Sequence, residues 1–396
     1  MSQEVKRWRG WRLAAGACVV AAMLAGCVSN PPATKGPVSL QLASQRLSDD
    51  LFSQVSGNLL ERLASRKVVL DPFIDAHTGQ QTASSVRAAQ IVSNRLRERK
   101  MGIKLERFDP NGVEQAEYLI AGTLRKAGPG SSDYVIQATI TDRRTSTVVA
   151  SATSTVRGSD IDTTPTAFYA DSPSMMADEL TKGYISTSQA ALGSPADQAY
   201  LASISTAALL NEATTAYNSG RYSDALMRYQ AVVQRPDGKQ LRVFNGLYNS
   251  HTKLGNTREA EAAFTELVRL GLETNNLAFR LLFNPGTTEF WRDRAISGNY
   301  PMWLRQIATV SSSGDYCMTV VGHTSKSGTE GANDRLSLQR AKVVREALVA
   351  QERKLADRVD TDGMGWRENL IGTGADDASD SPDRRVEFKV RNCKGR

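Results

Sequence analysis

Residues 322–341 read GHTSKSGTEGANDRLSLQRA, and this stretch decides the fold of the last third of the chain. The residues before it, 316–321, are mostly apolar and predict a strand. Gly322 and Gly328 bound a polar loop, and a helix is expected to open near Asn333. A strand, a glycine-containing loop and a helix in this order predict an α/β layer with polar side chains at the end of the strand.

The helix that this stretch opens carries one basic residue on its apolar side. At about 100° per residue, Leu336, Val343 and Ala347 lie within about 20° of one line, and Arg340 lies inside the apolar arc. A buried guanidinium costs free energy unless it meets an anion, and its planar fork suits a carboxylate. Two interpretations stay open: Arg340 binds the carboxylate of a ligand, or it extends past the apolar stripe or pairs with an internal acid, for which the candidates are Asp315, Asp334 and Asp383.

The loop, the helix start and a later run, Asp383-Arg384-Arg385-Val386-Glu387, together resemble the OmpA-like peptidoglycan-binding domain. The resemblance covers residues 278–396 and implies a βαβ unit in a mixed sheet. Within it we expect a strand over residues 279–290 with a turn at 284–286, a helix over 303–310 and a final strand over 383–388.

In that family the helix arginine holds a carboxylate of the diaminopimelate side chain in the stem peptide, and an aspartate of the loop holds its ammonium group. The position of that aspartate is Ser325 here, and the family's final-strand asparagine is Asp383. A hydroxyl supplies no charge, so the contact with the ammonium group is expected to be weaker. The resemblance implies that peptidoglycan is bound by Thr324, Ser325, Ser327, Asn333, Arg340 and Arg384.

Two cysteines, Cys317 and Cys393, lie at the start of one expected strand and beyond the end of the last one. If these strands are antiparallel neighbours, the two ends meet within the Cα separation that a disulfide needs. In an oxidising compartment we therefore expect a disulfide, the alternative being two free thiols.

The first half of the chain predicts an α/β layer domain over residues 39–196. Apolar stripes at helical spacing indicate helices over residues 40–63 and 85–99, and apolar runs indicate strands over 67–74, 118–122 and 134–140, the last followed by a hairpin return at 148–151. The strand that ends in Asp71-Pro72-Phe73, the strand that ends in Ala121-Gly122 and the hairpin resemble a periplasmic module of CsgG, FlgO and relatives of the TolB N-terminal domain. This resemblance implies a scaffold without catalytic residues.

Residues 204–274 repeat on themselves with an offset of 35 residues, because Gly220 to Ala225 is echoed by Gly255 to Ala260. The pattern resembles tetratricopeptide repeats, with Ala225 and Ala260 at the helix crossings. An unrelated pair of helical hairpins is the alternative. Two repeats are fewer than such a unit needs for stability, so it should lean on a neighbouring domain.

The first 26 residues read as a signal peptide, with basic residues followed by an apolar run that is too short to span a bilayer. Leu24-Ala25-Gly26-Cys27 closes it and resembles a bacterial lipobox, which implies that Cys27 is acylated and begins the mature chain. Residues 27–38 then form a linker. Lipoproteins retained at the inner membrane typically have Asp directly after the acylated cysteine, whereas position 28 is Val here. We therefore expect the protein to be anchored in the outer membrane and to face the periplasm.

Composition and motifs exclude several classes of function. The net charge of +7 falls to +4 without the leader, and basic clusters with interleaved aromatics are missing, so no nucleic-acid partner is expected. The three histidines have no metal-ligand spacing, and no nucleophile elbow occurs, so we expect no metal, no cofactor and no enzyme activity. The leading interpretation is a multidomain outer-membrane lipoprotein that binds peptidoglycan and scaffolds a flagellar, secretion or export apparatus. The alternative is the same scaffold with an OmpA-like domain that mediates protein contacts only.

Overall fold

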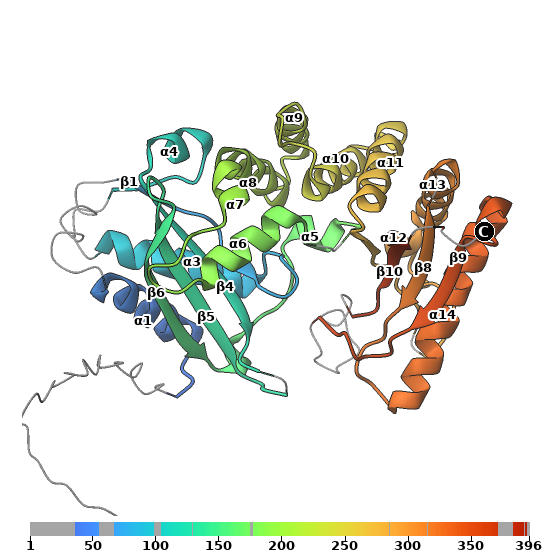
Figure 1. Cartoon of the computed structure of the whole chain (residues 1–396), viewed down its shortest axis with the longest axis horizontal. Helices are drawn as coiled ribbons and strands as arrows, with labels where there is room; N and C mark the ends of the chain where they lie inside the picture. The colour runs from blue at the N-terminus through green and yellow to red at the C-terminus, as the bar shows by residue number, and fades with distance from the viewer. Residues whose placement is uncertain are drawn as a thin grey trace, which may run out of the picture. The chain divides into compact units, whose positions relative to one another are not determined.

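A computed structural model describes residues 36–54, 67–98, 104–128, 130–174, 177–284, 286–314, 316–370, 383–391 and 393. The predicted signal peptide, Cys27 and all but residues 36–38 of the expected linker lie outside the described residues. The described residues mix α and β structure and contain two separate sheets (Figure 1).

The first sheet is built from residues 67–156 and mixes parallel and antiparallel strands. Its order is β3-β1-β4-β5-β6, and β2 pairs with β4. Strand β1 is parallel to β3 and β4, whereas β4, β5 and β6 form an antiparallel meander. The strands are β1 (Lys67–Leu70), β2 (Ile74–Asp75), β3 (Lys104–Glu106), β4 (Tyr118–Lys126), β5 (Tyr134–Asp142) and β6 (Thr147–Val156).

Helices cover both faces of this sheet, because β4 buries side chains on both sides. Tyr118 and Ile120 share an apolar cluster with α1 and α3, and Leu119 and Ala121 share another with Tyr184 of α6. The helices of this part are α1 (Leu40–Ser53), α3 (Ala83–Glu98), α4 (Pro110–Gln115), α5 (Ala167–Asp171), α6 (Glu179–Gln189) and α7 (Gln198–Ala202), with a 3-10 turn η1 (Gly158–Asp160).

Two expectations for this part need correction. The single strand predicted over residues 67–74 is divided into β1 and β2, because Pro72 has no N–H to donate to a ladder. Strand β3 was not predicted. The helix expected over residues 40–63 is α1 as far as Ser53, and residues 55–66 lie outside the described part of the chain.

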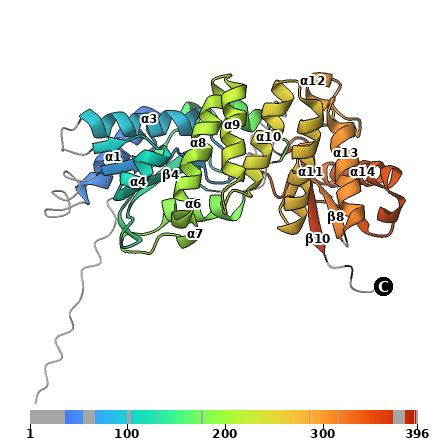
Figure 2. The same ribbon diagram turned by 90° about the horizontal axis from the view of Figure 1, so that it is seen from above.

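Four helices follow as two antiparallel pairs (Figure 2). Gly220 and Gly255 end the first helix of each pair with φ of +73° and +76°, a conformation that favours glycine. Ala225 and Ala260, at the repeated offset, are both buried. The pairs are α8 (Ile204–Asn218) with α9 (Tyr222–Val233), and α10 (Leu241–Lys253) with α11 (Thr257–Glu273).

The second sheet, formed by residues 277–391, has the order β7-β10-β8-β9. Strands β8 and β9 are parallel and joined through α14, whereas β10 is antiparallel to β7 and β8. A βαβ unit in a mixed sheet is therefore present, as predicted. The elements are β7 (Leu277–Phe279), α12 (Arg294–Ser297), α13 (Tyr300–Ser313), β8 (Cys317–Gly322), α14 (Glu330–Gln351), η2 (Arg353–Leu355), β9 (Val359–Gly363) and β10 (Val386–Arg391).

The C-terminal expectations also need correction. The strand predicted over residues 279–290 is wrong, because β7 ends at Phe279 and only an isolated bridge joins Phe283 to Phe290 across the predicted turn. Helix α14 begins at Glu330, three residues before the expected start, because the Thr329 side chain caps it. The last strand begins at Val386 instead of residue 383, and β9 was not predicted.

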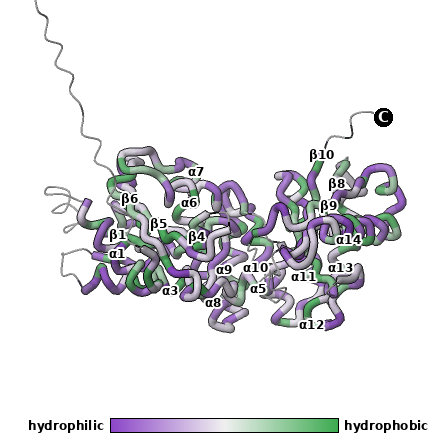
Figure 3. Tube along the Cα trace, turned by 90° about the horizontal axis from the view of Figure 1, so that it is seen from below, coloured by the Kyte–Doolittle hydropathy of each residue, from purple (hydrophilic) through white to green (hydrophobic). Residues whose placement is uncertain are grey.

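One apolar cluster joins the helix pairs to the C-terminal sheet. Phe264 of α11 stacks on Trp303 of α13 with ring centroids 5.6 Å apart, and Phe279 of β7 lies 5.2 Å from Phe264. The four helices therefore share a core with the C-terminal sheet. Within the described residues no helix is both long and apolar enough to span a bilayer, and Figure 3 shows helices of mixed colour.

Candidate functional site

The loop between β8 and α14 is held at the end of the C-terminal sheet by its backbone. The His323 N–H donates to Arg385 O at 3.1 Å and the Thr324 N–H donates to Gly365 O at 2.9 Å. Gly328 has a φ of +81°, which turns the loop back toward the helix. The loop therefore lies between the start of β10 and the turn that follows β9.

Asn333 fastens this loop to the first turn of α14. Its Nδ2 donates to Ser327 O at 2.6 Å and to Thr329 O at 3.1 Å. Close packing of β8 on α14 requires Gly322, since a Cβ there would lie 2.1 Å from Ser337 O. Asn333 and Ser327, both predicted site residues, are thus in direct contact.

Arg340 is on the buried face of α14, as the helical wheel indicates, and is 3% exposed. Its Nε donates to Thr287 O at 3.0 Å and its Nη2 to Asn284 O at 3.2 Å. The guanidinium carbon lies 4.9 Å from the centre of the Phe283 ring. The backbone carbonyls of Asn284 and Thr287 therefore hold the guanidinium.

The alternative in which Arg340 extends to solvent is wrong, because the side chain is buried. Among the acids considered as its partners, Asp334 accepts a hydrogen bond from Arg367 at 2.7 Å, and Asp383 accepts one from Leu370 N at 2.5 Å. The alternative in which Arg340 pairs with an internal acid stays open. Asp315 lies outside the described residues. The apolar stripe is also rotated: Leu336, Val343 and Ala347 are half-buried, and the fully buried apolar positions are Ala341, Val344 and Leu348.

The predicted binding residues are almost all buried. Thr324, Ser325, Asn333, Arg340 and Arg384 are 2 to 6% exposed, and Ser327 is half-buried. Strand pairing between Gly322 and Val386 brings the loop and Arg384 to the same end of the sheet. Within the described residues Thr324 Oγ1 has no hydrogen-bond partner. A buried hydroxyl of this kind costs free energy, and a ligand group would offset it.

A second buried polar group beside the loop was missed in the sequence. The ring of His323 lies between two carboxylates, with Nε2 3.5 Å from Glu387 Oε1 and Nδ1 4.0 Å from Glu368 Oε2. Arg385 Nη2 lies 2.6 Å from the same Glu387 oxygen. Burial would raise the pKa of Glu387, but the contacts with His323 and Arg385 outweigh it and hold that pKa at about 2. Arg385 directly precedes β10 and Glu387 lies two residues on, a spacing that places side chains on the same face of extended chain and could have revealed the pair.

Candidate metal-ligand atoms of His323, Glu368 and Glu387 all lie within 4.8 Å of one another. However, Lys389 Nζ approaches Glu368 at 3.8 Å, and Arg385 pairs with Glu387. The two carboxylates approach opposite nitrogens of the ring, whereas a metal ion would need them beside one nitrogen. Because each carboxylate already has a cation beside it, a polar cluster around a buried histidine describes these residues better than a metal centre.

A surface contact borders the loop. Lys326 Nζ lies 4.7 Å from the centre of the Trp366 ring, which follows β9. Arg367, next to that tryptophan, contacts both Glu330 and Asp334 of α14. The loop is thus bordered by aromatic and charged side chains that the family pattern did not indicate.

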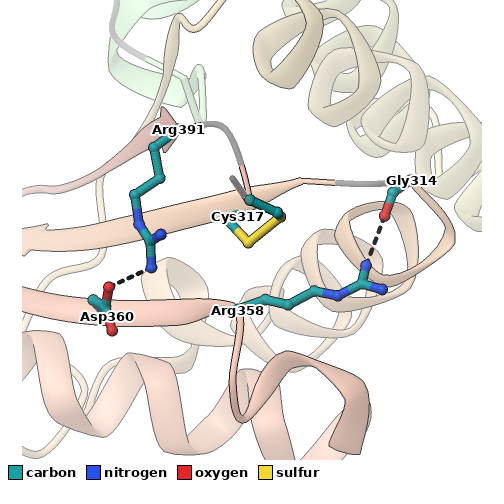
Figure 4. The surroundings of a disulfide bond; sticks show 6 residues. Gly314, Cys317, Arg358, Asp360 and Arg391 are labelled. Carbon is teal, nitrogen blue, oxygen red and sulfur yellow. Dashed lines mark hydrogen bonds and ion pairs between the residues drawn. A yellow bond between two sulfur atoms is a disulfide. The ribbon is translucent and has the colours of Figure 1, made fainter. Parts of the chain in front are cut away.

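At the opposite end of β8, Cys317 and Cys393 are joined by a disulfide with Cα atoms 5.2 Å apart (Figure 4). Strand pairing places Cys317 opposite Arg391, two residues before Cys393. Arg391 contacts Asp360 of β9, and Arg358 donates to Gly314 O at 2.9 Å. Strands β8, β9 and β10 are thus tied together at the end away from the loop.

Comparison with known proteins identifies the C-terminal part of the chain. Residues 282–381 match the model of the OmpA family. The peptidoglycan-binding protein ArfA of Mycobacterium tuberculosis and that of Mycobacterium bovis are each 35% identical over 107 residues, which is 26% of this chain and 32% of the relative. The chain therefore spans about a third of the length of the curated relatives it matches.

Two solved structures are similar over the same share of the chain. The peptidoglycan-associated lipoprotein from Burkholderia pseudomallei is 22% identical, with 28% of this chain and 88% of that chain covered and a TM-score of 0.25. The periplasmic domain of Helicobacter pylori MotB is 15% identical, with 30% and 81% covered and a TM-score of 0.25. On the family match, residues 282–381 of this chain are an OmpA-like domain.

Proposed function

We propose that the OmpA-like domain binds the stem peptide of peptidoglycan through the loop after β8 and the buried face of α14. The observation that carries this proposal is the buried polar set at one end of the sheet, in which Thr324 Oγ1 has no hydrogen-bond partner within the described residues. Arg340 supplies a buried cation beside the backbone carbonyls of Asn284 and Thr287. The similarity to ArfA, a peptidoglycan-binding protein, supports the same ligand.

The proposal extends to the anchoring of the chain. Processing before Cys27 and acylation of that residue would hold the protein at the outer membrane, and residues 28–38 would link it to the first sheet. The α/β part would act as a CsgG-like scaffold and the two helix pairs as tetratricopeptide-like repeats. Together they would recruit proteins of an envelope apparatus. A Cys27→Ala variant should remain as an unprocessed precursor at the inner membrane. Fractionation of this variant with the outer membrane would contradict the anchor.

A second function, protein binding without peptidoglycan, is favoured by two observations. Ser325 carries no charge at the position where the family has an aspartate, and two N–H groups of Arg340 already donate to backbone carbonyls. A stem peptide would therefore have to compete with these carbonyls for the guanidinium. In this alternative the domain keeps its fold and binds an envelope protein at the same loop.

Retention on isolated sacculi distinguishes the two functions, and α14 offers a matched control. Arg345 also donates through Nε and Nη2 to two backbone carbonyls, of Val359 at 2.7 Å and Ala356 at 2.6 Å. Arg340→Ala and Arg345→Ala should therefore cost similar stability. Only Arg340→Ala should abolish retention, since truncating one partner of a buried charged contact costs about 2–5 kcal/mol.

Ser325→Asp provides the opposite test. A carboxylate restores a charge-assisted contact of about 1.5–3 kcal/mol in place of a neutral one of about 1 kcal/mol, so retention should strengthen several-fold. If wild-type protein is not retained, and neither Arg340→Ala nor Ser325→Asp changes retention, the protein-binding function takes precedence.

A further inference from the structure

A cavity of about 190 Å³ lies away from the loop, where α8 and α10 meet the start of α13. Its walls combine aromatic rings with Asp171 of α5, Asn249 and Lys253 of α10 and Arg280, which follows β7. The OmpA-like site uses none of these residues. The volume is sufficient for a small organic group.

The charges around this cavity do not balance. Lys253 Nζ lies 3.0 Å from Asp171 Oδ2, and the Tyr217 hydroxyl donates to the same oxygen at 2.7 Å. Asp171 is the one acidic residue among the described residues that line the cavity. Arg280 donates through Nη2 to the carbonyl of Ala170, a neutral partner, so the lining does not neutralise its charge. Burial lowers the pKa of Arg280, as expected for a cation removed from water without full compensation.

Asn249, which also belongs to the lining, carries an unpaired acceptor. Its Nδ2 donates to Phe168 O at 3.2 Å and to Ser172 Oγ at 3.1 Å, and because the carbonyl can only accept, the orientation of the amide is fixed. Its Oδ1 is buried and accepts no hydrogen bond from the described residues, and the residue is 2% exposed. Leaving a buried carbonyl oxygen unpaired is costly, which points to a donor that arrives with a ligand.

Part of the remaining wall is formed by aromatic rings, whose polar atoms make hydrogen bonds within the protein. Trp303 Nε1 donates to Tyr248 Oη at 2.9 Å, and the Tyr300 hydroxyl accepts from Leu282 N at 3.0 Å. The rings of Tyr300 and Trp303 lie 5.1 Å apart. These rings offer apolar surface, which suits a short aliphatic side chain.

We propose that this cavity binds the C-terminal residue of a peptide. Its carboxylate would lie at Arg280 and Lys253, its amide N–H would donate to Asn249 Oδ1, and its side chain would rest on the rings of α10 and α13. An inorganic anion would satisfy the cations but would bring an acceptor against Asn249 Oδ1. The site is separate from the OmpA-like loop, and it stands or falls independently of sacculus binding.

Calorimetric titration of the full chain with N-acetyl-alanyl-alanine, as the L,L and D,D isomers, tests the proposal. For a ligand of this size, the affinity that small ligands reach per atom gives a Kd of about 1 mM for the better isomer. The C-terminal amide of the same dipeptide should bind at least tenfold more weakly, because it lacks the carboxylate. Equal binding of acid and amide, or no binding of either isomer at several millimolar, would overturn the proposal.

Two variants locate the site without removing a core residue. Lys253→Met should weaken binding about tenfold, the loss expected when one partner of a charged hydrogen bond is removed. Ile296→Trp, at an exposed position on the lining, should block entry. Lys182→Met is the matched control, since Lys182 is an exposed lysine 2.7 Å from Glu179 on α6. Unchanged affinity in both cavity variants, or an equal loss in the control, would contradict the assignment.

Discussion

Each of the two sheets buries a carboxylate at one end, yet the two pKa values move in opposite directions. Asp71, directly after β1, is 8% exposed, and burial raises its pKa to about 7 even though Tyr200 donates to it at 2.6 Å. Glu387 of β10 is 9% exposed, and its pKa is held at about 2 despite burial. The two residues differ in their direct partners, which are His323 and Arg385 for Glu387 and the Tyr200 phenol for Asp71.

Arg385 contacts the carboxylate of Glu387 directly, at 2.6 Å. Arg242 acts on Asp71 through its charge alone, and the hydrogen-bond partner of Asp71 is the neutral phenol of Tyr200. At Glu387 a charge-assisted hydrogen bond outweighs desolvation, whereas at Asp71 a neutral hydrogen bond does not. Acid should therefore stabilise the first sheet through Asp71 and destabilise the second through Glu387.

The largest expected effect comes from the disulfide, which constrains only the second sheet. Cys317 and Cys393 are separated by 76 residues, and closing a loop of that length is worth between about 4 and 5 kcal/mol in the chain-entropy model. Reduction, or Cys317→Ser with Cys393→Ser, should lower the urea midpoint read by tryptophan fluorescence. Trp291, Trp303 and Trp366 all lie in this part of the chain.

Hydrogen exchange in peptides that cover β4 and β5 provides the control, since the first sheet should keep its protection. The cysteines would be free if the electrophoretic mobility and the urea midpoint did not change on reduction and two thiols reacted after denaturation.

The next effect concerns Asp71. A raised pKa means that its contribution to stability is complete below the unfolded value near 3.8 and is lost as the pH rises to about 7, in total on the order of 4 kcal/mol. Asp71→Asn keeps an acceptor for Tyr200 and removes the charge. Protection of β1 and β4 should therefore rise from pH 8 to pH 5 in the wild type and stay level in the variant, after correction for intrinsic exchange. Asp162→Asn, at an exposed position, should behave like the wild type.

Glu387 should respond in the opposite sense and somewhat less. Its lowered pKa means that the stability it contributes is present above the unfolded value near 4.5 and is lost as the pH falls toward 2, on the order of 3 kcal/mol. Glu387→Gln should lower the urea midpoint of the second sheet at pH 7 and make it less sensitive to acid. Glu346→Gln, an exposed residue of α14, is the control. Equal acid sensitivity of wild type and Glu387→Gln would show that the His323 and Arg385 contacts do not stabilise the charged form.

Local patterns in the sequence predicted the parts of the fold that depend on local spacing. The glycines at 220 and 255 and the wheel position of Arg340 follow from residues a few positions apart, and the helix pairs and the buried guanidinium are found where expected. Strand β3 is short and has no buried residue, so it carries no apolar signal. Strand β9 alternates polar residues with a single buried valine and was missed for the same reason.

The partners within the candidate site could not be predicted, because they come from distant residues. The carbonyls that hold Arg340 belong to residues 53 and 56 positions away, and a carbonyl leaves no trace in the amino-acid sequence. The cavity at Asn249 also depends on Arg280 and on α13, which only the packing of the helix pairs against the C-terminal sheet brings together.

The smallest expected effect lies at the surface of the loop, where charge and ring meet in water. The contact between Lys326 and Trp366 should contribute about 0.5–1 kcal/mol, because an exposed cation over a ring stays hydrated. Lys326→Met should slightly increase exchange in the peptide that covers the loop and weaken retention on sacculi less than about threefold, whereas Lys326→Arg should keep both, since a guanidinium also stacks on a ring. If the arginine variant loses as much as the methionine variant, the ammonium group acts through a specific partner instead of the ring. A large loss of retention in both variants would mean that an exposed charge matters as much to this sheet as the buried pair of Arg385 and Glu387.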